Sequence, residues 1–241
     1  MNMNGEQHTD TPHYLHHQKN VFSENIREIV FGVQDGMVST LGAITGIALG
    51  SGSTGTVILA GIAIIAVESV SMAIGSYVSS HSEGKRTERV IDEEREEIAA
   101  CIECEQTEAK DLFVRDGWPE ALAMQMAEAA AREPRLMLRE MTYRELGVNP
   151  HGKNTSVQNG FAMFTAYVFG GSIPLVPYFL LPIPLAMPLS IPATLAGLFL
   201  LGTAISRYTA EKWYASGTRL FLFGGIALAI GFLVGTFVTV R

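Results

Sequence analysis

Four glutamates recur as two Glu-x-x-Glu pairs within one charged stretch of the chain: Glu94, Glu97, Glu105 and Glu108. The residues from Lys85 to Arg115 include neither proline nor glycine, so they predict one uninterrupted helix. At about 100° per residue, the four carboxylates fall within one narrow face of that helix. Carboxylates that share a face repel one another unless a cation lies against them. The spacing therefore predicts a cation-binding face.

The only two cysteines of the chain, Cys101 and Cys104, lie in the same stripe of this helix. Residues three apart lie within one helical turn, where helix geometry opposes a disulfide. We therefore expect both thiols to be reduced, to face the cytosol and to be available as extra metal ligands. The ordinary alternative is a solvated helix face, but these acids do not alternate with basic residues. Further along, Met141 and Glu145 form a one-turn pair that would close the site from the opposite side.

A second group of polar residues lies inside apolar sequence. Asp35 follows Ile29, Val30, Phe31 and Val33, and Glu68 and Met72 sit one turn apart in AVESVSMAIG. A carboxylate in hydrocarbon is costly and normally faces a partner or a water-filled path. A carboxylate beside a thioether suits Fe²⁺ better than Mg²⁺ or Ca²⁺. The alternatives are that Asp35 caps a helix at the membrane surface and that Met72 only packs.

The elements that carry these residues are those of a membrane protein. Hydrophobic residues make up 48% of the 241 positions and charged residues only 17%, against roughly 25% in soluble domains. Mean hydropathy is +0.23. Five apolar segments reach the roughly 20 residues that a spanning helix needs, at 29–50, 56–80, 157–181, 183–206 and 219–239. The first 25 residues are polar and rich in histidine, so no cleavable signal peptide is expected.

The basic residues predict an orientation. Sixteen of the 17 lysines and arginines fall on one side of the five spans, and only Arg241 falls on the other. We therefore expect a cytosolic tail over 1–28, two spans over 29–80, a cytosolic metal-binding insertion over 81–156 and three spans over 157–241. The C-terminus then lies outside, across a plasma membrane or a vacuole-type membrane. No basic face is interleaved with aromatic residues, so no nucleic acid is expected as a partner.

The insertion is predicted to form three helices. The first continues the second span to about Asp111, and Asp116-Gly117 breaks the chain. The second helix begins at Trp118-Pro119, where proline is tolerated in the first turn. Glu133-Pro134 ends it, and the third helix stops at Gly147.

Small residues recur at intervals of four in two of the spans, at Gly42, Gly46 and Gly50 and at Gly231 and Gly235. This spacing lets helix backbones approach closely in lipid, and the alternative is local flexibility. We expect packing for the first ladder, because three of its members align. A cluster of histidines near the N-terminus is more typical of a tail with incidental histidines than of a metal site: His8, His13, His16 and His17.

The chain resembles the vacuolar iron transporter family over nearly its whole length. The resemblance rests on Asp35-Gly36 in the first span, S-M-A-x-G-x-Y-x-S at the end of the second, and the Glu-x-x-Glu helix that leads into the insertion. It implies a homodimer of five-span subunits, with the ion path between the first and second spans of both. It also implies that Asp35 and Met72 are transport residues. The insertion ligands that it implies are Glu94, Glu97, Glu105, Glu108, Met141 and Glu145.

Some positions depart from the family pattern. Gly75-Ser76-Tyr77 stands where the family commonly has Gly-Glu-Tyr, and Ile64 stands where the family has a second acid. Glu68 lies one turn further on and can substitute for that acid. Thr142 replaces a second insertion methionine, and the two cysteines are additions. These differences bear on the ligand set and the metal preference more than on transport.

We therefore expect an all-α membrane protein with five transmembrane helices and a three-helix cytosolic metal-binding insertion between the second and third spans. It would export Fe²⁺ by exchange for protons, with Mn²⁺ or Zn²⁺ as alternative substrates. We expect no prosthetic group, no enzyme activity, and membrane lipid and a second copy of the chain as partners. A di-iron carboxylate oxidase would need Glu-x-x-His pairs, and none occurs in the sequence. A metal-sensing or storage module would not need acids within the first two spans.

Overall fold

The computed structural model of the protein describes residues 25–145, 147 and 155–239. Over these residues the chain forms α-helices and no strand, which confirms the expected all-helical class. The four N-terminal histidines lie outside the described residues. The helices are α2 (Ile26–Ser51), α3 (Thr54–Ala100), α4 (Ile102–Arg115), α5 (Glu120–Ala131), α6 (Pro134–Arg144), α7 (Ser156–Leu180), α8 (Ile183–Thr209) and α9 (Trp213–Thr239).

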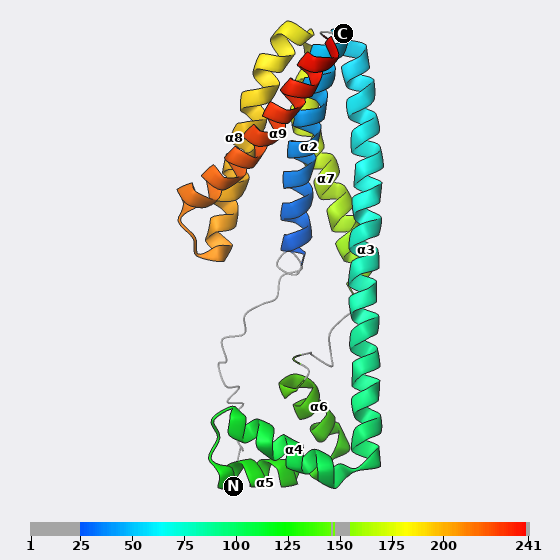
Figure 1. The fold of residues 1–241 in the computed structure, drawn as a ribbon, viewed down its shortest axis with the longest axis vertical. Helices are drawn as coiled ribbons and strands as arrows, with labels where there is room; N and C mark the ends of the chain where they lie inside the picture. Colours follow the sequence, from blue (N-terminus) through cyan, green and yellow to red (C-terminus); the bar gives the residue numbers. More distant parts are fainter. Residues whose placement is uncertain (1–24, 146, 148–154, 240–241) are drawn as a thin grey trace, which may run out of the picture.

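One long helix connects two separate groups of helices. In Figure 1, α2 and α7 lie beside the upper part of α3, α8 and α9 pack on the other side of α2, and α4, α5 and α6 gather at the lower end of α3. At 1.5 Å per residue, the 47 residues of α3 extend about 70 Å. A bilayer core is only about 30 Å thick. The apolar sequence of α3 lies in its first half. Helix α3 is therefore long enough to cross a membrane with that half while its second half holds α4–α6 well clear of the membrane.

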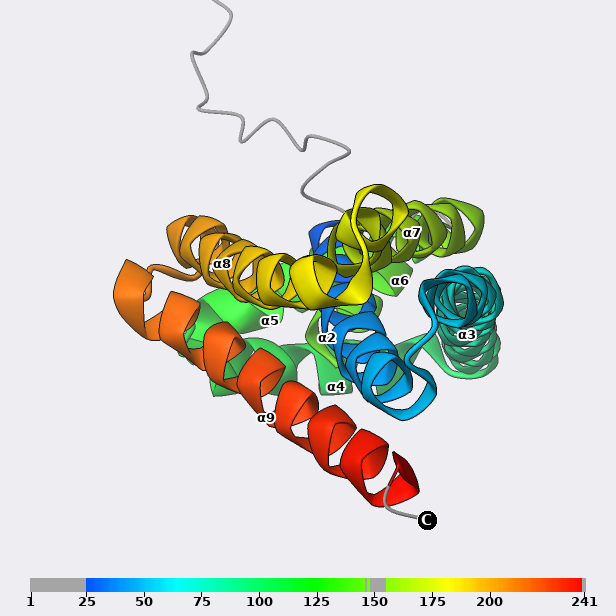
Figure 2. The ribbon, with the colours of Figure 1, turned by 90° about the horizontal axis from the view of Figure 1, so that it is seen from above.

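Four of the described helices are long and apolar enough to cross a membrane: α3, α7, α8 and α9. The first expected span, 29–50, corresponds to α2, which is not among them. Figure 2 shows α2 in the middle of the bundle, where it packs against α3, α7, α8 and α9. A helix enclosed by other helices contacts little lipid, so it can carry polar residues such as Gln34 and Asp35 that lower its hydropathy.

The expected packing role of the first glycine ladder is confirmed for Gly42 and Gly46, and the partner is α9. A Cβ placed on Gly231 would lie 2.0 Å from the carbonyl oxygen of Gly42, and one on Gly235 would lie 2.5 Å from that of Gly46. Only glycine at these positions allows α2 and α9 to approach so closely. The absence of side chains there is therefore a packing requirement of the bundle.

The expected helix boundary at Pro134 is confirmed: α6 begins there, in the first turn, where the missing N–H has no helical partner to lose. A second boundary lies at Pro182, since α7 ends at Leu180 and α8 starts at Ile183. Helices α4, α5 and α6 pack with the end of α3 around an apolar core that includes Ile98, Phe113 and Met141.

The expectation of one continuous acidic helix is wrong. Helix α3 ends at Ala100, and Cys101 leaves the helical conformation with φ −151° and ψ 80° before α4 begins at Ile102. The expectation of two free thiols is wrong as well, because Cys101 and Cys104 form a disulfide across a Cα–Cα distance of 5.3 Å. The two corrections share one cause: with Cys101 outside the helix as the cap of α4, the geometry that opposes an i, i+3 disulfide inside a helix no longer applies.

Candidate metal-binding sites

The first candidate site lies where α2, α3 and α7 meet in the bundle. The carboxylate of Glu68 on α3 accepts a hydrogen bond from Ser39 Oγ on α2 at 3.1 Å, and a second from the hydroxyl of Tyr167 on α7. The Ser39 and Tyr167 oxygens are themselves 2.5 Å apart. Tyr167 is completely buried. Glu68 therefore has a fixed position that depends on all three helices.

The other expected transport residues flank Glu68. Asp35 is half-buried, one turn from Ser39 on α2, and its charge interacts with that of Glu68. Met72 is half-buried one turn beyond Glu68 on α3. We call the five residues of this region the bundle site: Asp35, Ser39, Glu68, Met72 and Tyr167. A cation bound there would meet two carboxylates on neighbouring helices and a thioether one turn away, which is a donor set suited to a borderline divalent metal.

The sequence analysis missed three residues in or near the bundle site. Ser39 and Tyr167 have types that are common in membrane helices, and their role depends on a three-helix junction that no local pattern reveals. Glu28 is buried near the start of α2 and forms an ion pair with Arg27 at 2.8 Å. The sequence could have predicted Glu28, because it precedes Asp35 by two helical turns and so lies on the same face of the helix.

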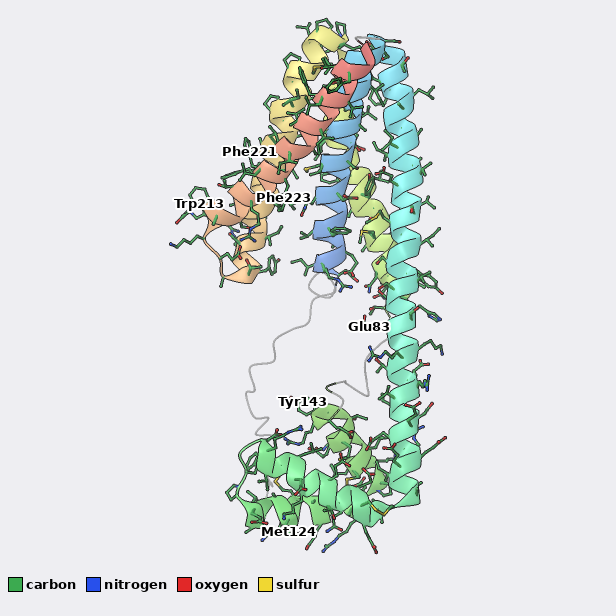
Figure 3. The ribbon with its side chains drawn as sticks, in the orientation of Figure 1. Glu83, Met124, Tyr143, Trp213, Phe221 and Phe223 are labelled. Carbon is green, nitrogen blue, oxygen red and sulfur yellow. A yellow bond between two sulfur atoms is a disulfide. The ribbon has the colours of Figure 1, made fainter. Side chains whose placement is uncertain are left out.

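The second candidate site joins α3, α4 and α6 away from the bundle. Glu94 and Glu105 are 3% and 7% exposed, although glutamate is almost never fully buried without a partner. Glu145 at the end of α6 lies close enough to Glu94 for the two carboxyl groups to interact. Glu97 and Glu108 are exposed, and their charges also act on Glu94. We call these five residues the carboxylate cluster. Figure 3 shows side-chain oxygens crowding the space between α3 and α6.

The break at Cys101 makes a single site possible. In one continuous helix, Glu94 and Glu105 would be separated by 11 residues, which is about 16 Å along the axis. Two carboxylates that bind the same ion must place their oxygens within about 5 Å of each other, because metal–oxygen bonds are about 2.0–2.6 Å long. The change of direction at Cys101 brings the second Glu-x-x-Glu pair back toward the first.

The electrostatics of the cluster favour a bound cation or proton. Burial, followed by the charges of Glu145, Glu105, Glu97 and Glu108, raises the pKa of Glu94 to about 7. Burial, followed by neighbouring carboxylates, also raises the pKa of Glu105 and of Glu145. One oxygen of Glu94 is buried without a hydrogen-bond partner. Such an atom is costly to bury, and a cation would satisfy it.

The carboxylate cluster is not arranged as a finished coordination sphere. Within the described residues, no three His, Cys, Asp or Glu side chains are already positioned to hold a metal ion. Since Glu97, Glu108 and Glu145 are exposed, rotation about their side-chain bonds can bring them toward the fixed carboxylates of Glu94 and Glu105. Cation binding at this site therefore requires side-chain movement but no change of fold.

The remaining expected ligands have other surroundings. Met141 is buried in the apolar core beneath the cluster, beside Met137. Thr142, which replaces a methionine of the family pattern, is buried and donates its hydroxyl hydrogen to the Leu138 carbonyl oxygen at 2.7 Å. Cys101 and Cys104 are joined as a disulfide and so present no thiolate in this form.

The two candidate sites are far apart. Glu68 and Glu94 lie on the same helix, 26 residues from one another, which corresponds to about 39 Å. An ion held by the carboxylate cluster therefore cannot contact the bundle site at the same time.

Comparison with known proteins gives a consistent result. The sequence model of the VIT family matches residues 26–236. The chain is 32% identical to Vacuolar iron transporter 1 of Arabidopsis thaliana over 220 residues, which cover 90% of this chain and 88% of that protein. It is 31% identical to Vacuolar iron transporter 1 of Eucalyptus grandis, covering 87% and 84%. Identity to the Vacuolar iron transporter of Plasmodium falciparum is 28%, covering 90% and 83%.

Proposed function

The chain belongs to the VIT family, and from this membership and the bundle site we propose that it transports ferrous iron across a membrane in exchange for protons. Manganese is the second substrate that we propose. The observation that carries the proposal is that Asp35 on α2 and Glu68 on α3 lie near enough for their charges to interact, inside a bundle that includes four span-capable helices among the described residues. Two acids in such a place are costly to keep unless they contact an ion or a path.

The bundle site supports exchange because protons and metal ions compete for the same oxygens. A carboxylate lone pair cannot hold a proton and a metal ion at once. We propose that Asp35 and Glu68 alternate between the two, and that Met72 adds a soft donor which favours Fe²⁺ over Mg²⁺ or Ca²⁺. Ser39 and Tyr167 hold Glu68 in position when no metal is present, through their hydrogen bonds to its carboxylate.

We propose that the carboxylate cluster collects metal ions on the cytosolic side. The distribution of lysine and arginine supports a cytosolic position for the insertion and for the N-terminus, with the C-terminus outside. Because the cluster is about 39 Å from Glu68 along α3, it acts by raising the local metal concentration. Glu94, Glu97, Glu105, Glu108 and Glu145 are the proposed ligands, and we propose Met141, which is buried in the apolar core of the insertion, as a further ligand.

We also propose that α2 crosses the membrane as a fifth span and that two chains associate. Helix α3 carries exposed apolar residues on the faces beside Glu68, including Val67 and Val70. A groove of about 710 Å³ follows α2 and α9, and Ser39 of the bundle site lines it. Association of two copies along α2 and α3 would enclose the half-exposed carboxylates of the path.

Vesicles containing the purified protein test the proposed exchange. A metal-sensitive dye inside the vesicles and a pH-sensitive dye in the same lumen report both ions at once. We expect Fe²⁺ entry together with loss of luminal protons, and faster entry when the lumen is acidic. Metal entry without any movement of protons would reject exchange, and empty vesicles provide the control for leakage.

The carboxylate cluster should bind metal in a strongly pH-dependent way. The pKa of Glu94 is raised to about 7, so this carboxyl gains a proton as the pH falls through 7 and loses its ability to bind a cation. We expect Mn²⁺ affinity to fall by roughly tenfold per pH unit below 7 if one proton is displaced. Calorimetric titration of the full-length protein between pH 5.5 and pH 8, values that span this pKa, measures the dependence.

The direction in which the stability of the metal-free protein changes with pH provides a matched test. A carboxyl whose pKa is higher in the folded state than in the unfolded state binds more protons when folded, so stability falls as the pH rises from about 4.5 through 7. Thermal unfolding of the metal-free protein should show this decrease, and Mn²⁺ should reverse it. Glu94→Gln should remove the part of this pH dependence that comes from Glu94, leave the part that comes from Glu105 and Glu145, and weaken Mn²⁺ binding. A metal affinity that is flat across this range would contradict the assignment of Glu94.

A further inference from the structure

The corner between α3 and α4 contains a chemical group that the proposed transport does not use. Cys101 ends α3 and caps α4, and its sulfur accepts a hydrogen bond from the Cys104 backbone N–H at 3.3 Å. The Cys101–Cys104 disulfide lies within this first turn of α4. Cys104 is exposed and lines a surface hollow of about 450 Å³ together with Glu108, so a small thiol can reach its sulfur.

The residues that usually end a helix do not mark this stop. The chain from Lys85 to Arg115 lacks proline and glycine, and Ala99, Ala100 and Ile102 around the corner are residues that helices accept. Inside a continuous helix, the side chains of residues three apart do not meet the geometry that a disulfide requires. Formation of the disulfide and departure from the helix at Cys101 therefore occur together.

This corner also sets the geometry of the carboxylate cluster. With the corner formed, Glu105 is buried and its charge acts on Glu94. Without the corner, the same two carboxylates would lie about 16 Å apart along one helix and could not share an ion. The state of two sulfur atoms is thus linked by geometry to the number of carboxylates that one cation can contact.

We propose that Cys101 and Cys104 are a reversible thiol–disulfide pair whose oxidation state sets the cation affinity of the carboxylate cluster, with a dithiol as the reaction partner. This inference rests on the proposed metal binding by the cluster. The disulfide form holds the corner and binds the cation tightly. The dithiol form releases Cys101 to helical backbone angles, separates the two Glu-x-x-Glu pairs and binds the cation weakly.

The exchange is a two-electron step. A thiolate of the partner attacks the exposed sulfur of Cys104, the Cys101–Cys104 bond breaks, and the Cys101 sulfur leaves as a thiolate that takes up a proton. The second thiol of the partner then attacks the partner's first sulfur, which is bonded to Cys104 in the mixed disulfide, and Cys104 is released as a thiol. The protein gains two electrons and two protons, and the partner becomes a disulfide. In a reducing cytosol the dithiol form would prevail at rest, so oxidation would increase metal capture.

Mn²⁺ titration of the full-length protein in lipid nanodiscs tests the proposal, because Mn²⁺ does not exchange electrons with thiols under nitrogen. The oxidised protein is compared with protein that has been reduced by a phosphine and then desalted, and thiol counts confirm both states. We expect reduction to weaken Mn²⁺ binding roughly tenfold or more. The double variant Cys101→Ser/Cys104→Ser should bind like the reduced protein and should not respond to oxidant.

Two further measurements separate failure of the switch from failure of the metal site. Glu105→Gln in the oxidised protein should weaken Mn²⁺ binding; unchanged binding would reject the metal site itself. If Glu105→Gln does weaken binding but oxidised and reduced wild type bind equally, the switch alone is rejected. Hydrogen exchange of the Ile102 and Glu103 amides reports the corner directly. As first residues of α4 they have no carbonyl one turn back, so protection should rise on reduction.

Discussion

Replacing Glu68 by glutamine is expected to lower Fe²⁺ transport in vesicles by roughly a hundredfold or more while leaving the helical bundle folded. Glutamine keeps the size of the side chain and can still accept hydrogen bonds from Ser39 and Tyr167. It cannot carry the negative charge that attracts a divalent cation, and it cannot exchange a proton. Initial rates of dye-reported metal entry, measured at matched protein content, give the effect.

The control for Glu68→Gln is Tyr167→Phe. This change removes one hydrogen bond to the carboxylate but retains the carboxylate itself and most of the buried ring. We expect a loss of about tenfold, which is a positioning effect, together with a shifted pH dependence of transport. Equal rates for Glu68→Gln and wild type would remove Glu68 from the path. That result would leave Asp35 as the only acid of the proposed exchange.

Much of the bundle site could be predicted from local sequence because a charged residue in an apolar segment is rare. Asp35 and Glu68 each stand out against their neighbours, and helical spacing places Met72 beside Glu68. The partners of Glu68 could not be predicted in the same way. Tyr167 lies more than ninety positions further along the chain, and its role depends on how α7 packs against α2 and α3.

The carboxylate cluster shows where a periodicity argument fails. The spacing of the glutamates indicated a shared face, but a continuous helix would have kept Glu94 and Glu105 too far apart to share an ion. The break at Cys101 brings them together, and the usual helix-ending residues do not mark it. The covalent bond between Cys101 and Cys104, together with the packing of Ile98 and Phe113 in the apolar core, overrides the local helix propensity.

Gly170→Val is expected to prevent normal assembly of the bundle. A Cβ on Gly170 of α7 would lie 2.2 Å from the carbonyl oxygen and 2.8 Å from the Cα of Val33 on α2. Both atoms belong to the backbone, so no side-chain rotation can relieve the clash, and α2 and α7 must separate. Overpacking of a core usually costs about 1–3 kcal/mol, and a backbone clash in the middle of a helix contact lies at or above the upper end of that range.

Gly225→Val on α9 is the matched control, because a Cβ at Gly225 meets nothing within 4 Å. We expect Gly170→Val to lower the yield of monodisperse protein and its unfolding temperature, and Gly225→Val to change neither. The separation of α2 from α7 would also pull Ser39 away from Tyr167, so protein that does fold should transport poorly although every carboxylate is present. Normal stability and transport of Gly170→Val would show that the close contact between α2 and α7 does not hold the bundle site together.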